Sequence, residues 1–116
     1  MQQTIYKICS ETLWREAQSL GVFAGAPVDL ADGFIHFSTA NQVRETAAKH
    51  FGGQGDLLLV ALDAGRLGSA LKYEVSRGGA LFPHLYGTFD PATVLWVRPL
   101  PLDAEGNHDF PALDGK

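Results

Sequence analysis

Two short segments hold most of the side chains in this chain that are able to do chemistry. In the first, residues 32–42, an extended backbone would place His36 and Ser38 on one face, because side chains alternate along a strand. Thr39 follows as the expected N-cap of a helix, and Gln42, three positions later, would complete a capping box. The strand would therefore carry an imidazole and a hydroxyl to a helix N-terminus, where free backbone N–H groups favour an anion.

The second segment, residues 82–87, reads Phe-Pro-His-Leu-Tyr-Gly and would present His84 and Tyr86 on one face if it is extended. The preceding strand offers the carboxylate of Glu74, and Arg77 in the glycine-rich turn after it could clamp a phosphate or a carboxylate. Together with His36 and Ser38, these groups supply bases, hydroxyls and a carboxylate. We therefore expect one polar pocket that takes a small anionic or nucleotide-like ligand.

Each of these residues also has a purely structural interpretation. A strand histidine is often half-buried and hydrogen-bonded, a threonine before a helix is explained by capping, and a strand glutamate is usually a solvated charge. Metal binding is not expected, because the histidines lack the close pair spacing of a metal motif. Ser38 does not lie in a Gly-x-Ser-x-Gly elbow, and the sequence has no phosphate-binding loop or dinucleotide fingerprint.

Composition points to one ordinary globular domain. The chain has 116 residues, of which 46% are hydrophobic and 19% are charged. The formal net charge of −4 argues against a general nucleic-acid-binding surface, so we expect no DNA partner. Cys9 is the only cysteine and lies in an apolar segment, which favours a core position and a reducing compartment. Without a recognisable signal peptide or membrane-spanning run, we expect a cytoplasmic protein and no membrane partner.

Hydrophobic spacing predicts the elements that must hold these side chains. The order of strands and helices favours an α+β fold, in which two helices pack on a mixed, mainly antiparallel sheet of about five to six strands. Residues 1–102 would form a single domain, and residues 103–116 a polar C-terminal tail. Strands are expected over residues 4–9, around His36, and over 56–63, 71–76 and 93–100. Residues 81–88 could also be extended, but Pro83 confines them to an edge strand or an irregular segment. Helices are expected over residues 10–20 and 40–51, and a loop over residues 21–31.

Several segments, taken together, resemble the family known as domain of unknown function 952. The likeness covers nearly the whole chain, and the stretches around His36 and His84 are its most specific parts. It implies a family without implying a reaction, since the family's activity is not established. The segments that carry the likeness are Ile5–Ile8, Trp14, Asp32–Thr39, Val43, Glu45–Thr46, Leu71–Glu74 and Phe82–Gly87.

The strand around His36 is also similar to the first motif of ADP-ribosyltransferase-like folds, including RNA 2′-phosphotransferases. There a strand histidine followed by Ser or Thr holds the ribose of NAD, so the resemblance implies NAD as a cofactor. It also implies that Glu74 stabilises the charge that develops as nicotinamide leaves, while Tyr86 stacks on the nicotinamide ring and Arg77 holds the pyrophosphate. In this chain Glu74 precedes Tyr86, whereas the acidic residue comes last in the pattern, and Phe37 replaces the usual glycine.

Two classes of function stay open on these grounds. In the first, a ligand pocket has His36 and Glu74 as its catalytic residues if transfer occurs, and its ligand-binding residues are Ser38, Thr39, Arg77, His84 and Tyr86. In the second, the chain is a non-catalytic partner-binding module with structural histidines. Its contact surface would then be an exposed patch of Phe34, Phe82 and Trp96.

Overall fold

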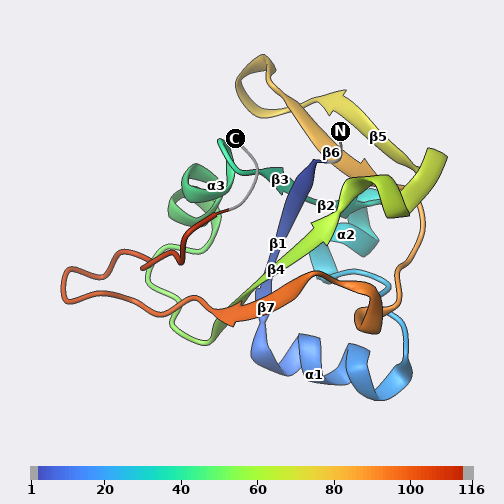
Figure 1. The fold of residues 1–116 in the computed structure, drawn as a ribbon. Helices are drawn as coiled ribbons and strands as arrows, with labels where there is room; N and C mark the ends of the chain where they lie inside the picture. The colour runs from blue at the N-terminus through green and yellow to red at the C-terminus, as the bar shows by residue number, and fades with distance from the viewer. Residues whose placement is uncertain (1–2, 114–116) are drawn as a thin grey trace.

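The computed structural model describes residues 3–113 and confirms the α+β class (Figure 1). All strand pairs are antiparallel, and the strands form two sheets, with orders β3-β1-β4-β7 and β2-β6-β5. The strands are β1 Thr4–Ser10, β2 Ile35–His36, β3 Ser38–Thr39, β4 Leu57–Asp63, β5 Leu71–Val75, β6 Leu81–Leu85 and β7 Trp96–Pro99. The helices are α1 Glu11–Leu20, α2 Pro27–Asp32 and α3 Val43–His50, with 3₁₀ turns η1 Ala64–Ala70, η2 Arg77–Gly79 and η3 Pro91–Thr93.

The four-stranded sheet is covered on both faces, as the unbroken apolar run of β4 predicts. Strands β1 and β4 pair along their whole length at its centre, and their alternate residues enter two separate clusters. One cluster contains Ile5 and Val60 together with Trp14 of α1, and the other contains Tyr6 and Leu59 together with α3. Figure 1 shows α1 and α3 on opposite sides of this central pair.

The second sheet arises because the chain leaves one sheet for the other at Phe37. Strand β2 pairs with β6, whereas β3, one residue later, pairs with β1. The Phe37 N–H donates to the carbonyl of Pro83, which ends the pairing of β2. One sheet was expected from the sequence, whereas the strands form two. Strand pairing decides where a sheet divides, and hydrophobic periodicity does not reveal which strands pair.

Strand β6 lies in the middle of its sheet, so the expectation that Pro83 confines it to an edge is wrong. The N–H and C=O of one residue point to the same side of an extended strand, and the Pro83 carbonyl points toward Phe37. An N–H at position 83 would therefore have pointed toward Phe37, beyond the end of β2, and its absence in proline costs no hydrogen bond between strands. The ladder between β6 and β5 loses no hydrogen bond.

Helix α1 agrees closely with expectation. The Ser10 hydroxyl accepts a hydrogen bond from the Leu13 N–H at 3.1 Å, and Gly21 closes the helix in the left-handed conformation at φ 77°. Trp14 and Ala17 form its buried side.

Two local expectations are wrong. Residues 27–32, expected in a loop, form α2, which starts with Pro27 at its first position and ends at Gly33 with φ 88°. Thr39 is not the cap of α3, because the helix begins four residues later and has Gln42 as its N-cap. Instead the Thr39 N–H donates to the Gln42 side-chain oxygen, so the two residues close a turn ahead of the helix.

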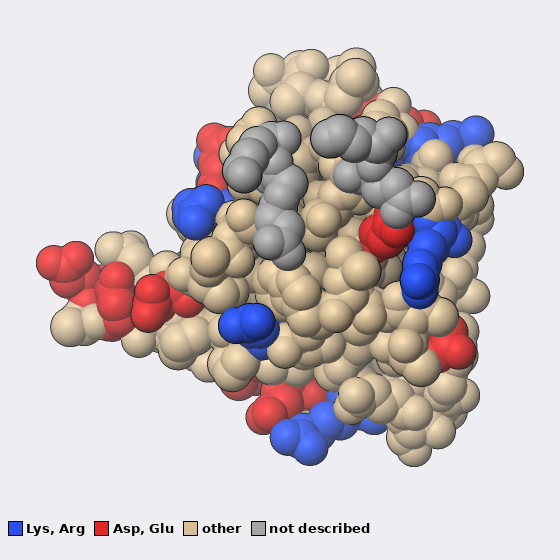
Figure 2. Space-filling view, viewed as in Figure 1, with Lys and Arg blue, Asp and Glu red and all other residues tan. Residues whose placement is uncertain are grey.

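The segment after β7 folds back on α3. Leu102 and His108 form a β-bridge, and Phe110 and Leu113 pack against the cluster beneath α3. Figure 2 shows acidic side chains gathered at the tip of this hairpin, whereas the lysines and arginines on that face lie scattered. No helix between residues 3 and 113 is long and apolar enough to cross a bilayer.

Replacement of the α1 cap, Ser10→Ala, should lower the free energy of unfolding by about 1 kcal/mol, because the Leu13 N–H loses its acceptor. Ser19→Ala, at an exposed position of the same helix, is the matched control and should not lower the free energy of unfolding, because alanine is the better helix former. Urea denaturation followed by circular dichroism measures both, and equal losses would contradict the capping role.

Candidate functional site

A cavity of about 590 Å³ lies where the two sheets separate. Strands β1, β2, β3 and β6 and helices α2 and α3 all contribute to its wall, so it depends on the change of sheet at Phe37. Three of the predicted site residues, His36, Ser38 and His84, face it together. The remaining wall consists of Tyr6, Lys7, Ile8, Val28, Asp32, Phe37, Thr46, His50, Phe51, Ser76 and Phe82.

Asp29 forms a buried floor beneath the cavity wall, where it holds Lys7 and His36, and does not line the cavity itself. Its side chain is fully buried and accepts hydrogen bonds from the Lys7 ammonium at 3.0 Å, the Ala26 N–H at 2.7 Å and the His36 N–H at 3.0 Å. The His36 ring lies 2.6 Å away through Nδ1. Lys7 also donates to the His36 carbonyl oxygen at 3.0 Å. One carboxylate thus joins α2 to β1 and β2, and every polar group in this buried cluster has a partner.

The charges of this cluster are matched. Burial by itself would raise the pKa of Asp29, but the His36 hydrogen bond and the charge of Lys7 outweigh it and lower the pKa to about 2. Burial lowers the pKa of Lys7 from its ordinary value, and the Asp29 charge opposes that shift. Asp29 and Lys7 therefore stabilise each other as an ion pair, at the desolvation cost that any buried pair carries.

His36 lies between two carboxylates. Its Nδ1 faces Asp29 at 2.6 Å and its Nε2 faces Asp32 at 2.9 Å. Each ring nitrogen therefore has a carboxylate oxygen within hydrogen-bond distance. Asp32 is half exposed at the end of α2, so its contact with Nε2 is the one that a ligand could replace.

His84 is oriented by a different carboxylate. Its Nδ1 lies 2.8 Å from Glu74 Oε1, and the Tyr86 hydroxyl donates to the same oxygen at 2.7 Å. The Tyr86 and His84 hydrogen bonds lower the pKa of Glu74, and the Glu74 bond raises the pKa of Tyr86. Among residues 3–113, with the Arg77 side chain left aside, Nε2 of His84 has no hydrogen-bond partner, so this nitrogen can contact a ligand.

Phe34 holds the two histidines against each other. Its ring stacks on His84 at 4.1 Å between centroids, and it also contacts His36 at 4.6 Å and Tyr86 at 5.2 Å. His36 and His84 are register partners of β2 and β6, with ring centroids 5.5 Å apart. The aromatic cluster therefore restricts both imidazoles to one orientation.

The other predicted residues lie in different surroundings. Glu74 and Tyr86 contact His84 but are not among the described residues that line the cavity. The Ser38 hydroxyl pairs with that of Thr46 at 2.9 Å, while Thr39 serves the turn before α3. The backbone of Arg77 lies in η2, and its side chain is outside the part of the structure that is described.

The exposed aromatic patch expected for a partner-binding module is not formed. Phe82 is only 7% exposed and faces the cavity. Trp96 is partly buried against Tyr6 of the same four-stranded sheet, and the Phe34 ring packs against both histidines. The three rings therefore share no surface.

Sequence reasoning missed the acidic floor of the site. Lys7 within the apolar strand Thr4–Ser10 was the available signal, because a lysine is seldom fully buried without an anionic partner. Asp29 gave no such signal, since it lay in a segment expected to be a loop. Thr46 and His50 reach the cavity from α3, which only the packing of that helix reveals.

Two further observations concern metal-binding groups and the cysteine. Among residues 3–113, no group of three or more His, Cys, Asp or Glu side chains could hold a metal ion. Cys9 is buried, as expected, and its burial raises the pKa of its thiol to about 11, which makes it a poor nucleophile.

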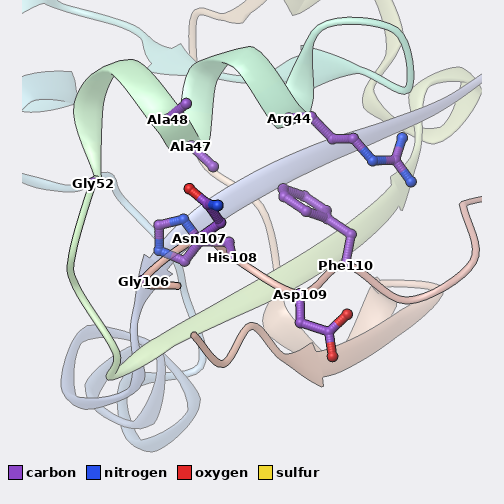
Figure 3. Close-up of a pocket in the computed structure, with 9 residues that line it drawn as sticks. All are labelled: Arg44, Ala47, Ala48, Gly52, Gly106, Asn107, His108, Asp109 and Phe110. Carbon is purple, nitrogen blue, oxygen red and sulfur yellow. The ribbon is translucent and has the colours of Figure 1, made fainter. Parts of the chain in front are cut away.

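A second hollow, of about 410 Å³, lies between α3 and the C-terminal hairpin (Figure 3). In Figure 3, the Arg44 guanidinium and the Asp109 carboxylate point away from Ala47 and Ala48. Arg44 lies over the Phe110 ring, 5.3 Å from its centroid. The charged groups of this hollow do not converge, and the cavity between the sheets is therefore the stronger candidate site.

Comparison with known proteins gives one family and one set of similar structures. The model of the family described as Protein of unknown function (DUF952) matches residues 8–97. The crystal structure of protein CC0527 from Caulobacter crescentus is 51% identical, with a TM-score of 0.88, and the match covers 91% of this chain and 93% of that one. The solution NMR structure of CC0527 is 52% identical, with a TM-score of 0.81 and 90% of each chain covered. No curated protein matches.

Removal of the buried carboxylate, Asp29→Asn, should lower the free energy of unfolding by about 3–5 kcal/mol, because it leaves the Lys7 ammonium buried without an anion. Asp32→Asn, at the half-exposed contact of the same histidine, should cost less than about 1 kcal/mol. The double variant Lys7→Met with Asp29→Asn should cost less than Asp29→Asn alone, since no unpaired charge remains. Chemical denaturation measures the free energy of unfolding of each variant. Equal losses for Asp29→Asn and Asp32→Asn would contradict the role of Asp29 as the partner of the buried Lys7 ammonium.

Acid should weaken the fold through the same carboxylate. The folded pKa of Asp29, about 2, lies below the ordinary value of 3.8, so its contribution is present above pH 3.8 and is lost as the pH falls toward 2. The difference corresponds to about 2 kcal/mol. Urea titrations at successive pH values should show this decline, and the decline should be smaller in Asp29→Asn. If the free energy of unfolding of Asp29→Asn falls with pH as steeply as that of the native protein, other carboxyl groups cause the acid sensitivity.

Proposed function

The chain belongs to the DUF952 family of proteins of unknown function, and we propose that its cavity between the two sheets binds a small anionic or nucleotide-like molecule. The observation that carries the proposal is the convergence of His36, His84 and Ser38 on one cavity whose other walls are largely apolar and aromatic. Small-molecule sites commonly combine apolar walls with a few oriented polar groups. The floor beneath them is held rigid by Asp29.

The polar groups of the cavity divide into those that are satisfied and those that can bind. The charges of Lys7 and Asp29 are matched to each other and serve the scaffold. The Thr46 hydroxyl donates to the Gln42 carbonyl and pairs with the Ser38 hydroxyl, so His84 Nε2 and the Ser38 hydroxyl are the groups that we expect to meet a ligand. An anionic group would be received by His36 Nε2 in place of Asp32, with a planar apolar part against Phe82 and Phe51. This division supports a ligand such as a nucleotide, which has one charged and one aromatic end.

We propose binding of such a ligand without ADP-ribosyl transfer. The transfer mechanism implied by the resemblance needs Glu74 beside the reacting sugar, with Tyr86 stacked on nicotinamide. In the described part of the chain, both residues lie behind His84 and do not line the cavity. A carboxylate stabilises a developing cation only at close range, so the role of Glu74 in this proposal is to orient His84. The lone buried Cys9 is consistent with the cytoplasmic location that we propose.

Histidine NMR signals test the binding proposal directly. Addition of NAD, ADP-ribose or AMP should shift the ring signals of His36 and His84. The signals of His108 should stay unchanged, since its ring contacts the Gln54 carbonyl away from the cavity. Ser38→Ala should weaken the affinity for the nucleotide that binds by roughly tenfold, whereas Ser19→Ala should not change it. If none of these nucleotides, nor phosphate, moves the signals of His36 or His84, the proposal fails.

Incubation with NAD separates binding from transfer. We expect NAD to stay intact, because Glu74 does not reach the cavity wall. Chromatographic detection of nicotinamide is the measurement. Release of nicotinamide by the native protein but not by folded Glu74→Gln would overturn this expectation and restore the transferase mechanism.

A further inference from the structure

Strand β5 is the open edge of the three-stranded sheet. The order β2-β6-β5 leaves one side of β5 without a neighbour among the strands of the described chain, and Figure 1 shows it at the outer margin of the molecule. The Tyr86 N–H donates to the Ala70 carbonyl and the Ser76 N–H donates to that of Ala80, so residues 70, 72, 74 and 76 direct their backbone groups toward β6. By alternation, the backbone groups of Leu71, Tyr73 and Val75 point outward.

This edge has little protection against pairing beyond the charges of Lys72 and Glu74. It contains no proline and no bulge, and two of its large apolar side chains are exposed, Tyr73 by 41% and Val75 by 71%. The cross-strand partner of Val75, Leu81 of β6, is 53% exposed on the same face and extends the apolar surface. Natural edge strands with outward backbone groups and apolar side chains readily pair with another strand.

We propose that β5 is a self-association edge, at which a second copy of this chain adds its own β5 antiparallel, centred on Tyr73. In this register Tyr73 faces Tyr73 of the second copy, and Leu71 faces its Val75. The outward groups then form four hydrogen bonds, two between the tyrosines and two from Val75 N–H groups to Leu71 carbonyls. The Leu71 N–H is excluded because it already donates to Gly68.

Charge selects this register over its neighbours. Lys72 and Glu74 lie on the other face of β5, and pairing centred on Tyr73 places each Lys72 opposite the Glu74 of the other copy. A shift of the centre to residue 72 would oppose two lysines, and a shift to residue 74 would oppose two glutamates. Glu74 can accept the new partner, since the His84 and Tyr86 hydrogen bonds both go to Oε1, and Oε2 accepts none from the residues whose side chains are described. The second copy would thereby place a cation beside the carboxylate that orients His84.

The small area of the β5 edge determines how strongly the dimer is expected to associate. Stable dimers bury about 1,200 Å² or more, and we expect one five-residue edge, with its exposed Tyr73 and Val75 and the neighbouring Leu81 of β6, to bury less than this. Sedimentation equilibrium should therefore show a monomer–dimer equilibrium that shifts toward the dimer as protein concentration rises. A monomer at every concentration reached would overturn the proposal.

Charge variants test the register. Lys72→Glu and Glu74→Lys should each weaken the dimer by roughly tenfold, because like charges then face each other twice. An equimolar mixture of the two variants should recover the native dimer strength, since every glutamate then faces a lysine. Circular dichroism checks that both variants are folded, and Lys49→Glu on α3 is the matched control with unchanged association. Weakening in both variants without recovery in the mixture would refute this register.

A cross-link provides a second readout that does not depend on affinity. Directly opposite residues of an antiparallel pair lie within the Cα separation that a disulfide spans. Tyr73→Cys should therefore form a disulfide-linked dimer under mild oxidation, because the native Cys9 is buried and does not compete. Leu20→Cys, at an exposed position of α1, is the control. Equal cross-linking of the two variants would indicate random collision and would overturn the proposal.

Discussion

The buried carboxylate of Asp29 is the interaction on which the rest of this site depends. It neutralises Lys7 in the central sheet, accepts the Ala26 N–H that starts α2, and fixes both the backbone and the ring of His36 in the second sheet. Three elements distant in sequence therefore meet at two oxygen atoms. A buried ion pair is poor evidence for stability in itself, but its strict need for partners makes it a strong constraint on geometry.

The same constraint explains how two similar side chains come to differ. His36 and His84 are register partners with rings in contact, but His36 lies between two carboxylates, whereas His84 contacts one through Nδ1 and keeps Nε2 available. Phe34, packed against both, fixes their relative orientation. Oriented imidazoles at a largely apolar cavity form the kind of site in which a few polar groups determine which ligand is bound.

The division of the strands into two sheets gives this cavity its place. Strands β2 and β3 are separated by Phe37 alone, yet they pair with different partners, and the space between the diverging sheets is lined from both. Glu74 and Tyr86 belong to the same region but act from behind His84. Between the sheets the protein thus has an inner group of ligand-facing side chains and an outer group that orients them, as in many sites where geometry must be exact to a fraction of an ångström.

The sequence by itself singled out His36, Ser38 and His84, but their meeting at one cavity depends on the pairing of β2 with β6. It determined the α+β class, helix α1 with its Ser10 cap, the buried strand β4, and the core positions of Cys9 and Trp14. These features follow from local periodicity, capping and polar residues placed in apolar strands, all of which can be read within a few positions. Only the tertiary structure decided the split of the sheet at Phe37, the central place of β6, helix α2 and the role of Asp29. The reason is physical: strand pairing and the neutralisation of a buried charge join residues more than twenty positions apart, and no local pattern encodes which of them will meet.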